Sequence, residues 1–248
     1  MTRQLNAPYA GRVQDRLTRW LLLGGVVGPL LFIVVFLIEG ATRPGYSAWR
    51  NYVSDLALSN QGWEQVANFL VCGVLVIGLA VGLRRALRTG TASVWGPLLM
   101  GIFGIGLVVA GIFPTDPGRN YPPGAPLNGT PTTFHGWVHG INAIPVFLIL
   151  AILPFILARR FAEEPENHSW ATYSRIVGAV IILTFIGGNV IGPLGEHGLI
   201  PPLSGLVQRI QIIAGWTWIS LTAVRLLQRR PVVRQMVRQS TPYHLPGG

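Results

Sequence analysis

The 248-residue chain contains no lysine and a single cysteine, Cys72, although 19 arginines give it a formal net charge of +10. One cysteine excludes an internal disulfide framework. Charged residues make up only 11% of the chain, whereas hydrophobic residues make up 50%. Because no soluble basic domain is present, the positive charge does not indicate a nucleic-acid-binding protein, and no nucleic-acid partner is expected.

Long apolar runs account for most of the chain. A helix needs about 20 residues to cross a bilayer core of about 30 Å. In lipid the backbone must satisfy its hydrogen bonds within the segment, so spanning runs are helical. The chain is therefore predicted to be an all-α, polytopic membrane protein with a bundle of six transmembrane helices. The predicted spans are about 20–38, 66–83, 94–113, 134–158, 176–194 and 204–224.

The arginines alternate between the two sides of these spans. Fifteen precede span 20–38, follow span 204–224, or lie in the two connections between 66–83 and 94–113 and between 134–158 and 176–194. Cytoplasmic segments retain positive charge, so both termini are predicted to be cytoplasmic. The other side holds only Arg43, Arg50, Arg119 and Arg209.

Three segments follow from this topology. Residues 1–18 form a basic cytoplasmic N-terminus, and residues 19–227 form one membrane domain. Residues 228–248 form a basic, proline-containing tail that is expected to be disordered and to contact anionic lipid headgroups. The first run is too long for a cleaved signal peptide and is expected to remain as an anchor. Membrane lipids are therefore the expected partners.

The connections on the extracytoplasmic side are longer and richer in polar residues. Segment 47–58 is predicted to form a short interfacial helix. Segment 114–133 is rich in proline and glycine and is predicted to be a turn-rich cap without regular structure. Within the spans, glycines four residues apart predict close helix packing. The pairs are Gly24/Gly28, Gly78/Gly82, Gly136/Gly140 and Gly188/Gly192.

His135, His139 and Asn142 follow an i, i+4, i+7 spacing, so they share one face of a helix. Two imidazoles four residues apart can hold zinc, with His197, Asp55, Asp116 or Glu196 as the third ligand. The glutamate that usually follows the first histidine is absent, since the sequence reads His-Gly-Trp-Val-His. The alternative is that these histidines hydrogen-bond to loop groups and hold the cap on the bundle.

Arg209 lies about one turn inside the last span. A charge at this depth needs a carboxylate partner or an anionic ligand. Glu39 and Glu196 are the expected partners within the chain. The alternative is a clamp for a lipid phosphate or carboxylate, for which the planar guanidinium is suited.

Two blocks of sequence resemble a known family. Pro44-Gly-Tyr-Ser, Val53-Ser-Asp-Leu and Asn68-Phe form the first, and Gly111-Ile-Phe-Pro-Thr-Asp-Pro followed by His135 forms the second. Together they are similar to the bacterial family called domain of unknown function 998, over about residues 20–228. The resemblance implies a six-span protein of the bacterial cytoplasmic membrane with no assigned activity. It also implies that Ser54, Asp55, Pro114, Asp116 and His135 belong to the shared pattern.

Two functional hypotheses follow. In the first, a polar His/Asp/Arg pocket at the extracytoplasmic face binds a lipid or small amphiphile, with Asn142, Glu196 and Arg209 as ligand contacts. In the second, the protein is a metal-assisted hydrolase of lipid-like substrates, loosely similar to alkaline ceramidases, whose seven-span layout it does not match. Zinc would be held by His135, His139 and His197, and Asp55 or Asp116 would activate the bound water.

Overall fold

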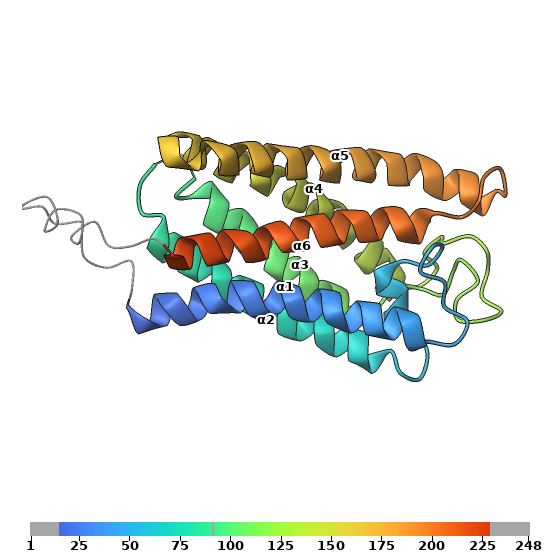
Figure 1. The fold of residues 1–248 in the computed structure, drawn as a ribbon. Coiled ribbons are helices and arrows are strands. Elements are labelled where there is room, and N and C mark those ends of the chain that lie inside the picture. The colour runs from blue at the N-terminus through green and yellow to red at the C-terminus, as the bar shows by residue number, and fades with distance from the viewer. Residues whose placement is uncertain (1–14, 91, 229–248) are drawn as a thin grey trace, which may run out of the picture.

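The computed structural model describes residues 15–90 and 92–228, so most of the predicted basic N-terminus and tail lie outside the described residues. The described chain forms six α-helices, each long and apolar enough to cross a membrane. It contains no strand, and two short 3-10 helices, η1 (Val53–Ala57) and η2 (Pro165–Asn167), lie in connections. The long helices are α1 (Arg16–Thr42), α2 (Trp63–Ala86), α3 (Trp95–Ile112), α4 (Phe134–Ala162), α5 (His168–Glu196) and α6 (Ser204–Gln228) (Figure 1).

All six predicted spans are confirmed as helices, and five of these helices are longer than the apolar runs. Helices α4 and α5 each reach 29 residues, because their polar terminal turns stay helical. Arg159 and Arg160 in the last turn of α4 favour this, since positive charge is stabilised at a helix C-terminus. At its other end, α4 begins after Thr133, whose side chain accepts a hydrogen bond from the Gly136 amide.

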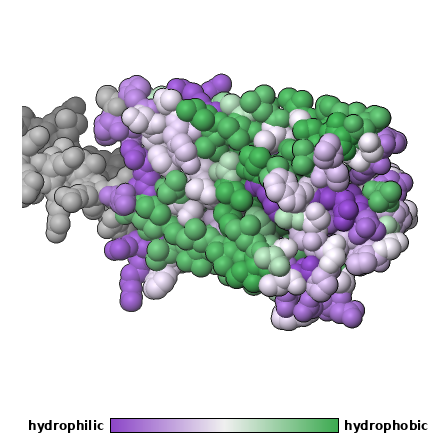
Figure 2. Space-filling view, turned by 45° about the vertical axis from the view of Figure 1, so that its right-hand side comes forward, coloured by the Kyte–Doolittle hydropathy of each residue, from purple (hydrophilic) through white to green (hydrophobic). Residues whose placement is uncertain are grey.

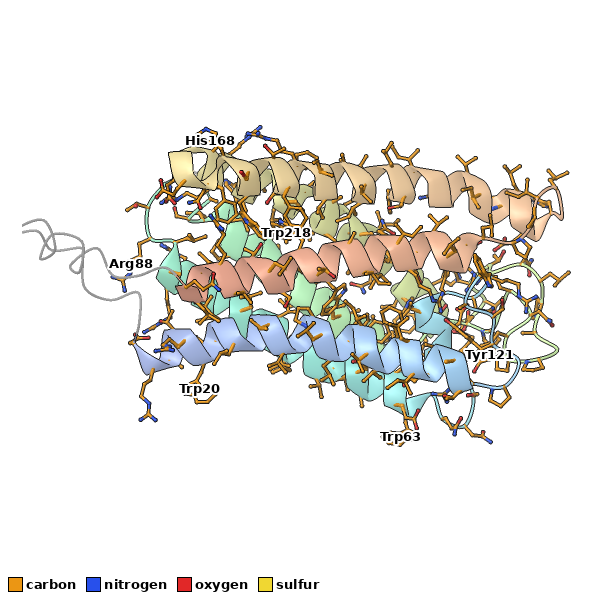
Figure 3. The ribbon with its side chains drawn as sticks, in the orientation of Figure 1. Trp20, Trp63, Arg88, Tyr121, His168 and Trp218 are labelled. Atoms are coloured by element: carbon orange, nitrogen blue, oxygen red, sulfur yellow. The ribbon has the colours of Figure 1, made fainter. Side chains whose placement is uncertain are left out.

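The helices form a ring in which each packs against its neighbour in sequence and α6 closes on α1. Helix α1 begins and α6 ends at the same end of the bundle, here called the Arg end (Figure 1). The opposite end, the loop end, carries segments 43–62, 113–133 and 197–203. A hydrophobic belt covers the bundle between two more hydrophilic ends (Figure 2). Trp20 and Trp63 point outward near opposite edges of this belt, as residues at membrane interfaces do (Figure 3).

The bundle core contains a cluster of aromatic rings about halfway along the helices. The rings of Phe32 and Trp216 stack in parallel with centroids 4.3 Å apart. Phe103 meets Trp216 edge-on at 5.7 Å. Trp218, two residues further along α6, is also buried and donates a hydrogen bond to Ser174 Oγ at 2.9 Å. This cluster joins α1, α3 and α6.

Helices α4 and α5 pack closely only near the Arg end. There a Cβ on Gly178 would overlap the ring of Phe155, and the rings of Phe161 and Trp170 meet edge-on at 6.1 Å. Toward the loop end α4 descends away from α5 (Figure 1). A Cβ on Gly140 would meet only Pro131 of the cap, at 3.7 Å. The two helices therefore leave space between their loop-end halves.

Candidate functional site

A buried ion pair holds the cap on the bundle. Arg119 Nε donates to Asp55 Oδ2 at 3.2 Å, and Arg119 Nη2 donates to Asp55 Oδ1 at 2.7 Å. The guanidinium also lies over the Tyr52 ring, 4.2 Å from its centroid. Asn51 Nδ2 donates to the Arg119 carbonyl at 3.0 Å. The prediction of an irregular cap over 114–133 is confirmed among the described residues, and these contacts tie it to the connection between α1 and α2.

Asp116 acts at the start of α4. Its carboxylate accepts hydrogen bonds from the Thr132 amide at 2.6 Å, the Thr133 amide at 2.8 Å and the Thr133 hydroxyl at 2.6 Å. Desolvation raises the pKa of Asp116, but the hydrogen bonds from Thr133 and Thr132 outweigh it and lower that pKa below its ordinary value. A carboxylate beside a helix N-terminus is stabilised by the helix dipole. Asp116 therefore anchors the cap to α4.

The three predicted zinc ligands differ in their burial and in their contacts. His135 is exposed and its ring packs against that of Phe113, with centroids 5.3 Å apart. His139 is buried, and its Nδ1 lies 2.8 Å from the Phe113 carbonyl, which can only accept, so Nδ1 carries the proton. His197 is exposed after the end of α5. Within residues 15–90 and 92–228, no group of three or more His, Cys, Asp and Glu side chains could hold a metal ion.

Arg209 is buried and points into the bundle, but its predicted carboxylate partner is wrong. Nη1 donates to the carbonyls of Ala48 at 2.7 Å, Asn51 at 2.9 Å and Gly205 at 2.9 Å. Nη2 donates to the Tyr46 hydroxyl. The first loop folds over α6, and its carbonyl oxygens satisfy the guanidinium without a carboxylate.

The two carboxylates expected beside Arg209 lie near other arginines. Glu39 Oε1 is 3.7 Å from Arg43 Nη2, and Glu196 Oε1 is 3.9 Å from Arg119 Nη1. Arg209 itself is not among the residues that line the cavity described next. These contacts give Arg209 a structural role, fastening the first loop to α6, and its role as a ligand clamp stays a prediction.

A cavity of about 530 Å³ lies inside the ring of helices and reaches the loop end. Its inner part is lined by Phe32, Phe103, Leu150 and Trp216. Its outer part is lined by polar side chains from the connection between α1 and α2, from the cap and from α4, α5 and α6. They include Tyr52, Arg119, His139, Asn142, Asn189 and Glu196. The cavity thus has an apolar floor and a polar mouth.

The cavity comes to the surface between α4 and α5. Its lining residues on α1, α2 and α3 are all buried, whereas Gly140 and Ile144 on α4 and Asn189 and Pro193 on α5 are exposed. Ile144 is 53% exposed although it lies about 15 Å along α4 from its first residue. This side of the cavity therefore faces the apolar belt.

Sequence reasoning identified His139, Asn142 and Glu196 in the cavity wall but missed Arg119. That residue was counted only as one of four arginines on the extracytoplasmic side. A partial signal was present, since Arg119 is the single positive charge of segment 114–133 and Asp55 is an opposite charge in a connection at the same end of the bundle. The aromatic floor carried no signal beyond that of an ordinary apolar span.

These features define a six-helix, multi-pass membrane protein with a cavity beneath an ion-paired cap. The family model described as "Protein of unknown function (DUF998)" matches residues 26–225, and the chain belongs to this family. The resemblance carried by the two sequence blocks is thereby confirmed. No curated protein and no solved structure matches the chain. Within the blocks, Ser54 lines the cavity, Asp55 holds Arg119 and Asp116 anchors the cap.

Proposed function

We propose that this protein binds a single-chain lipid or a comparable small amphiphile in the cavity. The supporting observation is the division of the lining into an aromatic floor and a polar mouth within about 530 Å³. Sites for small molecules have volumes of about 300–1,000 Å³ and combine apolar walls with a few polar groups. The floor suits a hydrocarbon chain, and the mouth suits a headgroup.

The occupant reaches this site from the outer leaflet of the bacterial cytoplasmic membrane. The distribution of arginine supports this orientation, because cytoplasmic segments retain positive charge. At the loop end Arg43, Arg119 and Arg209 are all buried and engaged within the protein. The exposed lining residues on α4 and α5 then face the hydrocarbon of the outer leaflet.

The alternative function, metal-assisted hydrolysis, has weaker support. Asp55 is engaged by Arg119 and Asp116 by the start of α4, so neither carboxylate is free to activate water. The described histidines are not gathered with a third ligand. Zinc analysis of the purified protein separates the two functions: stoichiometric zinc lost on substitution of His139 would favour hydrolysis, and the binding proposal expects none.

Two adjacent glycines provide a matched test of the cavity. Gly188 lines it, and a Cβ there would meet only Val207, at 3.5 Å, so a larger side chain has room to enter. Gly187 does not line it, and a Cβ there would meet nothing within 4 Å. Gly187→Leu and Gly188→Leu therefore make the same chemical change outside and inside the cavity.

The measurement is saturable binding of radiolabelled 1-O-dodecylglycerol to protein in phosphatidylcholine nanodiscs. The parent and Gly187→Leu should bind alike. Gly188→Leu should bind roughly tenfold more weakly, since excluding two methylene groups costs about 0.8 kcal/mol each and about 1.4 kcal/mol is tenfold. Equal binding by all three proteins would mean that the probe occupies the lipid-facing surface, and the proposal would fail.

A further inference from the structure

The charges in the cavity wall are unbalanced. Among the described lining residues, apart from the imidazole of His139, the ionisable side chains that carry full charge are Arg119 and Glu196. Asp55 takes both Nε and Nη2 of Arg119 in a bidentate pair. The remaining Nη1 is 3.9 Å from Glu196 Oε1, which is beyond hydrogen-bonding distance. Since Asp55 already balances Arg119, Glu196 contributes a surplus negative charge to the mouth.

The amide side chains in the wall add hydrogen-bond acceptors. Asn142 Nδ2 donates to the Gly106 carbonyl at 2.8 Å, and Asn189 Nδ2 donates to the Phe185 carbonyl at 2.8 Å. Because a carbonyl can only accept, one N–H of each amide faces that carbonyl, and the amide oxygen and the second N–H are left for a ligand. Gln211 follows the same pattern with a longer contact of 3.5 Å.

One amide has the opposite arrangement. Gln208 Oε1 accepts from the Val53 amide at 2.7 Å, which leaves its NH₂ group to donate. The wall therefore offers the carboxylate of Glu196 and several amide oxygens, alongside amide N–H groups and a guanidinium whose charge Asp55 already balances. An anionic headgroup would be repelled by Glu196, whereas a positively charged N–H donor would find an opposite charge and amide acceptors.

We propose that the cavity selects an amphiphile with a cationic, hydrogen-bond-donating head, such as a primary alkylammonium, and that Glu196 is the residue that selects it. This inference rests on the proposed binding function and names the class of its ligand. The side chain of Glu196 is 27% exposed, so solvent weakens its attraction, and a preference of about tenfold is expected.

A purely structural role for Glu196 makes a different prediction. If Glu196 only fastens the end of α5 to the cap through Arg119, its loss would lower stability without changing which headgroup binds. The test must therefore read headgroup preference and stability in the same proteins.

The experiment compares three probes with one dodecyl chain: dodecylammonium, 1-O-dodecylglycerol and dodecyl sulfate. Each is titrated below its critical micelle concentration into nanodiscs of zwitterionic phosphatidylcholine that contain the parent, Glu196→Gln or Glu64→Gln. Glu64 is the matched control, because it is a carboxylate of the loop end, paired with Arg43 at 3.0 Å, that does not line the cavity. Both variants remove one negative charge from the same end of the protein.

In the parent and in Glu64→Gln, dodecylammonium should bind about tenfold more tightly than the glyceryl ether, and dodecyl sulfate should bind most weakly. In Glu196→Gln the preference for ammonium should disappear. Added salt should also reduce it, since screening weakens a partly exposed charge pair.

Three results would overturn the inference: equal binding of sulfate and ammonium by the parent, a preference retained in Glu196→Gln, or an equal loss of preference in Glu64→Gln. A lower unfolding temperature of Glu196→Gln with unchanged preference would assign Glu196 the structural role instead. If the glyceryl ether binds in a manner sensitive to Gly188→Leu but no headgroup preference exists, only this inference fails. If no probe binds saturably, the proposed function itself fails.

Discussion

Helices α1 and α2 and the loop-end halves of α4 and α5 carry the same sequence feature, glycines four residues apart, but use it in opposite ways. A Cβ on Gly28 would lie 3.2 Å from the Cβ of Leu75, and one on Gly82 would lie 3.0 Å from the Cβ of Leu21. These glycines let α1 and α2 touch. A Cβ on Gly140 or Gly188 would meet no atom of the facing helix of the α4–α5 pair.

The difference lies in what faces each glycine rather than in the glycine pattern. Where a neighbouring helix presents a leucine, the absence of a Cβ allows close approach. Where the neighbour has diverged, the same absence leaves part of a cavity unfilled. The prediction of close helix packing is therefore right for Gly24/Gly28 and Gly78/Gly82. It is also right for Gly188 and Gly192 on α5, where a Cβ would face Val207 and Ser204 of α6 at 3.5 and 3.7 Å. It is wrong for Gly136 and Gly140 on α4, which face Asp116 and Pro131 of the cap.

The largest expected effect concerns the cap, which lies over the loop-end halves of α4 and α5. Arg119→Leu would leave Asp55 buried without its cation, and breaking a buried ion pair in this way costs about 3–5 kcal/mol. The unfolding temperature in detergent should fall sharply, and less so for Arg119→Lys, which keeps the charge. A melting curve of Arg119→Leu that overlays the parent's would show that the cap does not depend on this pair.

A smaller effect contrasts the tight contact between α2 and α3 with the loop-end half of α5. A Cβ on Gly104 would lie 2.9 Å from the Ile77 amide nitrogen, so Gly104→Leu must push α2 and α3 apart. Overpacking of this kind costs about 1–3 kcal/mol. Gly187→Leu meets open space and should leave stability unchanged or slightly higher. Equal unfolding temperatures of the two variants in detergent would contradict this difference in packing.

The smallest effect concerns the start of α4. Asp116→Asn removes a carboxylate that accepts several hydrogen bonds beside a helix N-terminus, which is worth about 0.3–1 kcal/mol. The folded-state pKa of Asp116 is below its ordinary value of 3.8, so this stabilisation is present above that value and is lost as pH falls through the folded-state pKa. The difference in unfolding free energy between parent and variant should therefore be largest at pH 7 and small near pH 3. A difference in unfolding free energy that does not change with pH would argue against an effect of the Asp116 charge.

Much of the fold follows from local patterns. Apolar runs located all six helices, and the burial of Arg209 follows from the cost of a charge in lipid. The Arg119–Asp55 pair does not follow, because it joins the irregular cap to η1, and the two residues are 64 positions apart in the chain. The i, i+4 spacing placed His135 and His139 near each other on α4, but among the described residues no third ligand joins them. The cavity arises where helices do not pack against each other, and no local sequence pattern predicts such a place.

Two tryptophans on α6 allow the most direct test of the cavity. Trp216 and Trp218 are 2% and 0% exposed, but only Trp216 lines the cavity. A 1-O-dodecylglycerol analogue with a diazirine at the end of its chain would be photolysed in nanodiscs, and labelled residues mapped by peptide mass spectrometry. Labelling at Trp216 should be competed by unlabelled ether and be markedly weaker in Gly188→Leu, with Trp218 unlabelled. Labelling confined to lipid-exposed residues, or equal at both tryptophans, would contradict an amphiphile site inside the bundle.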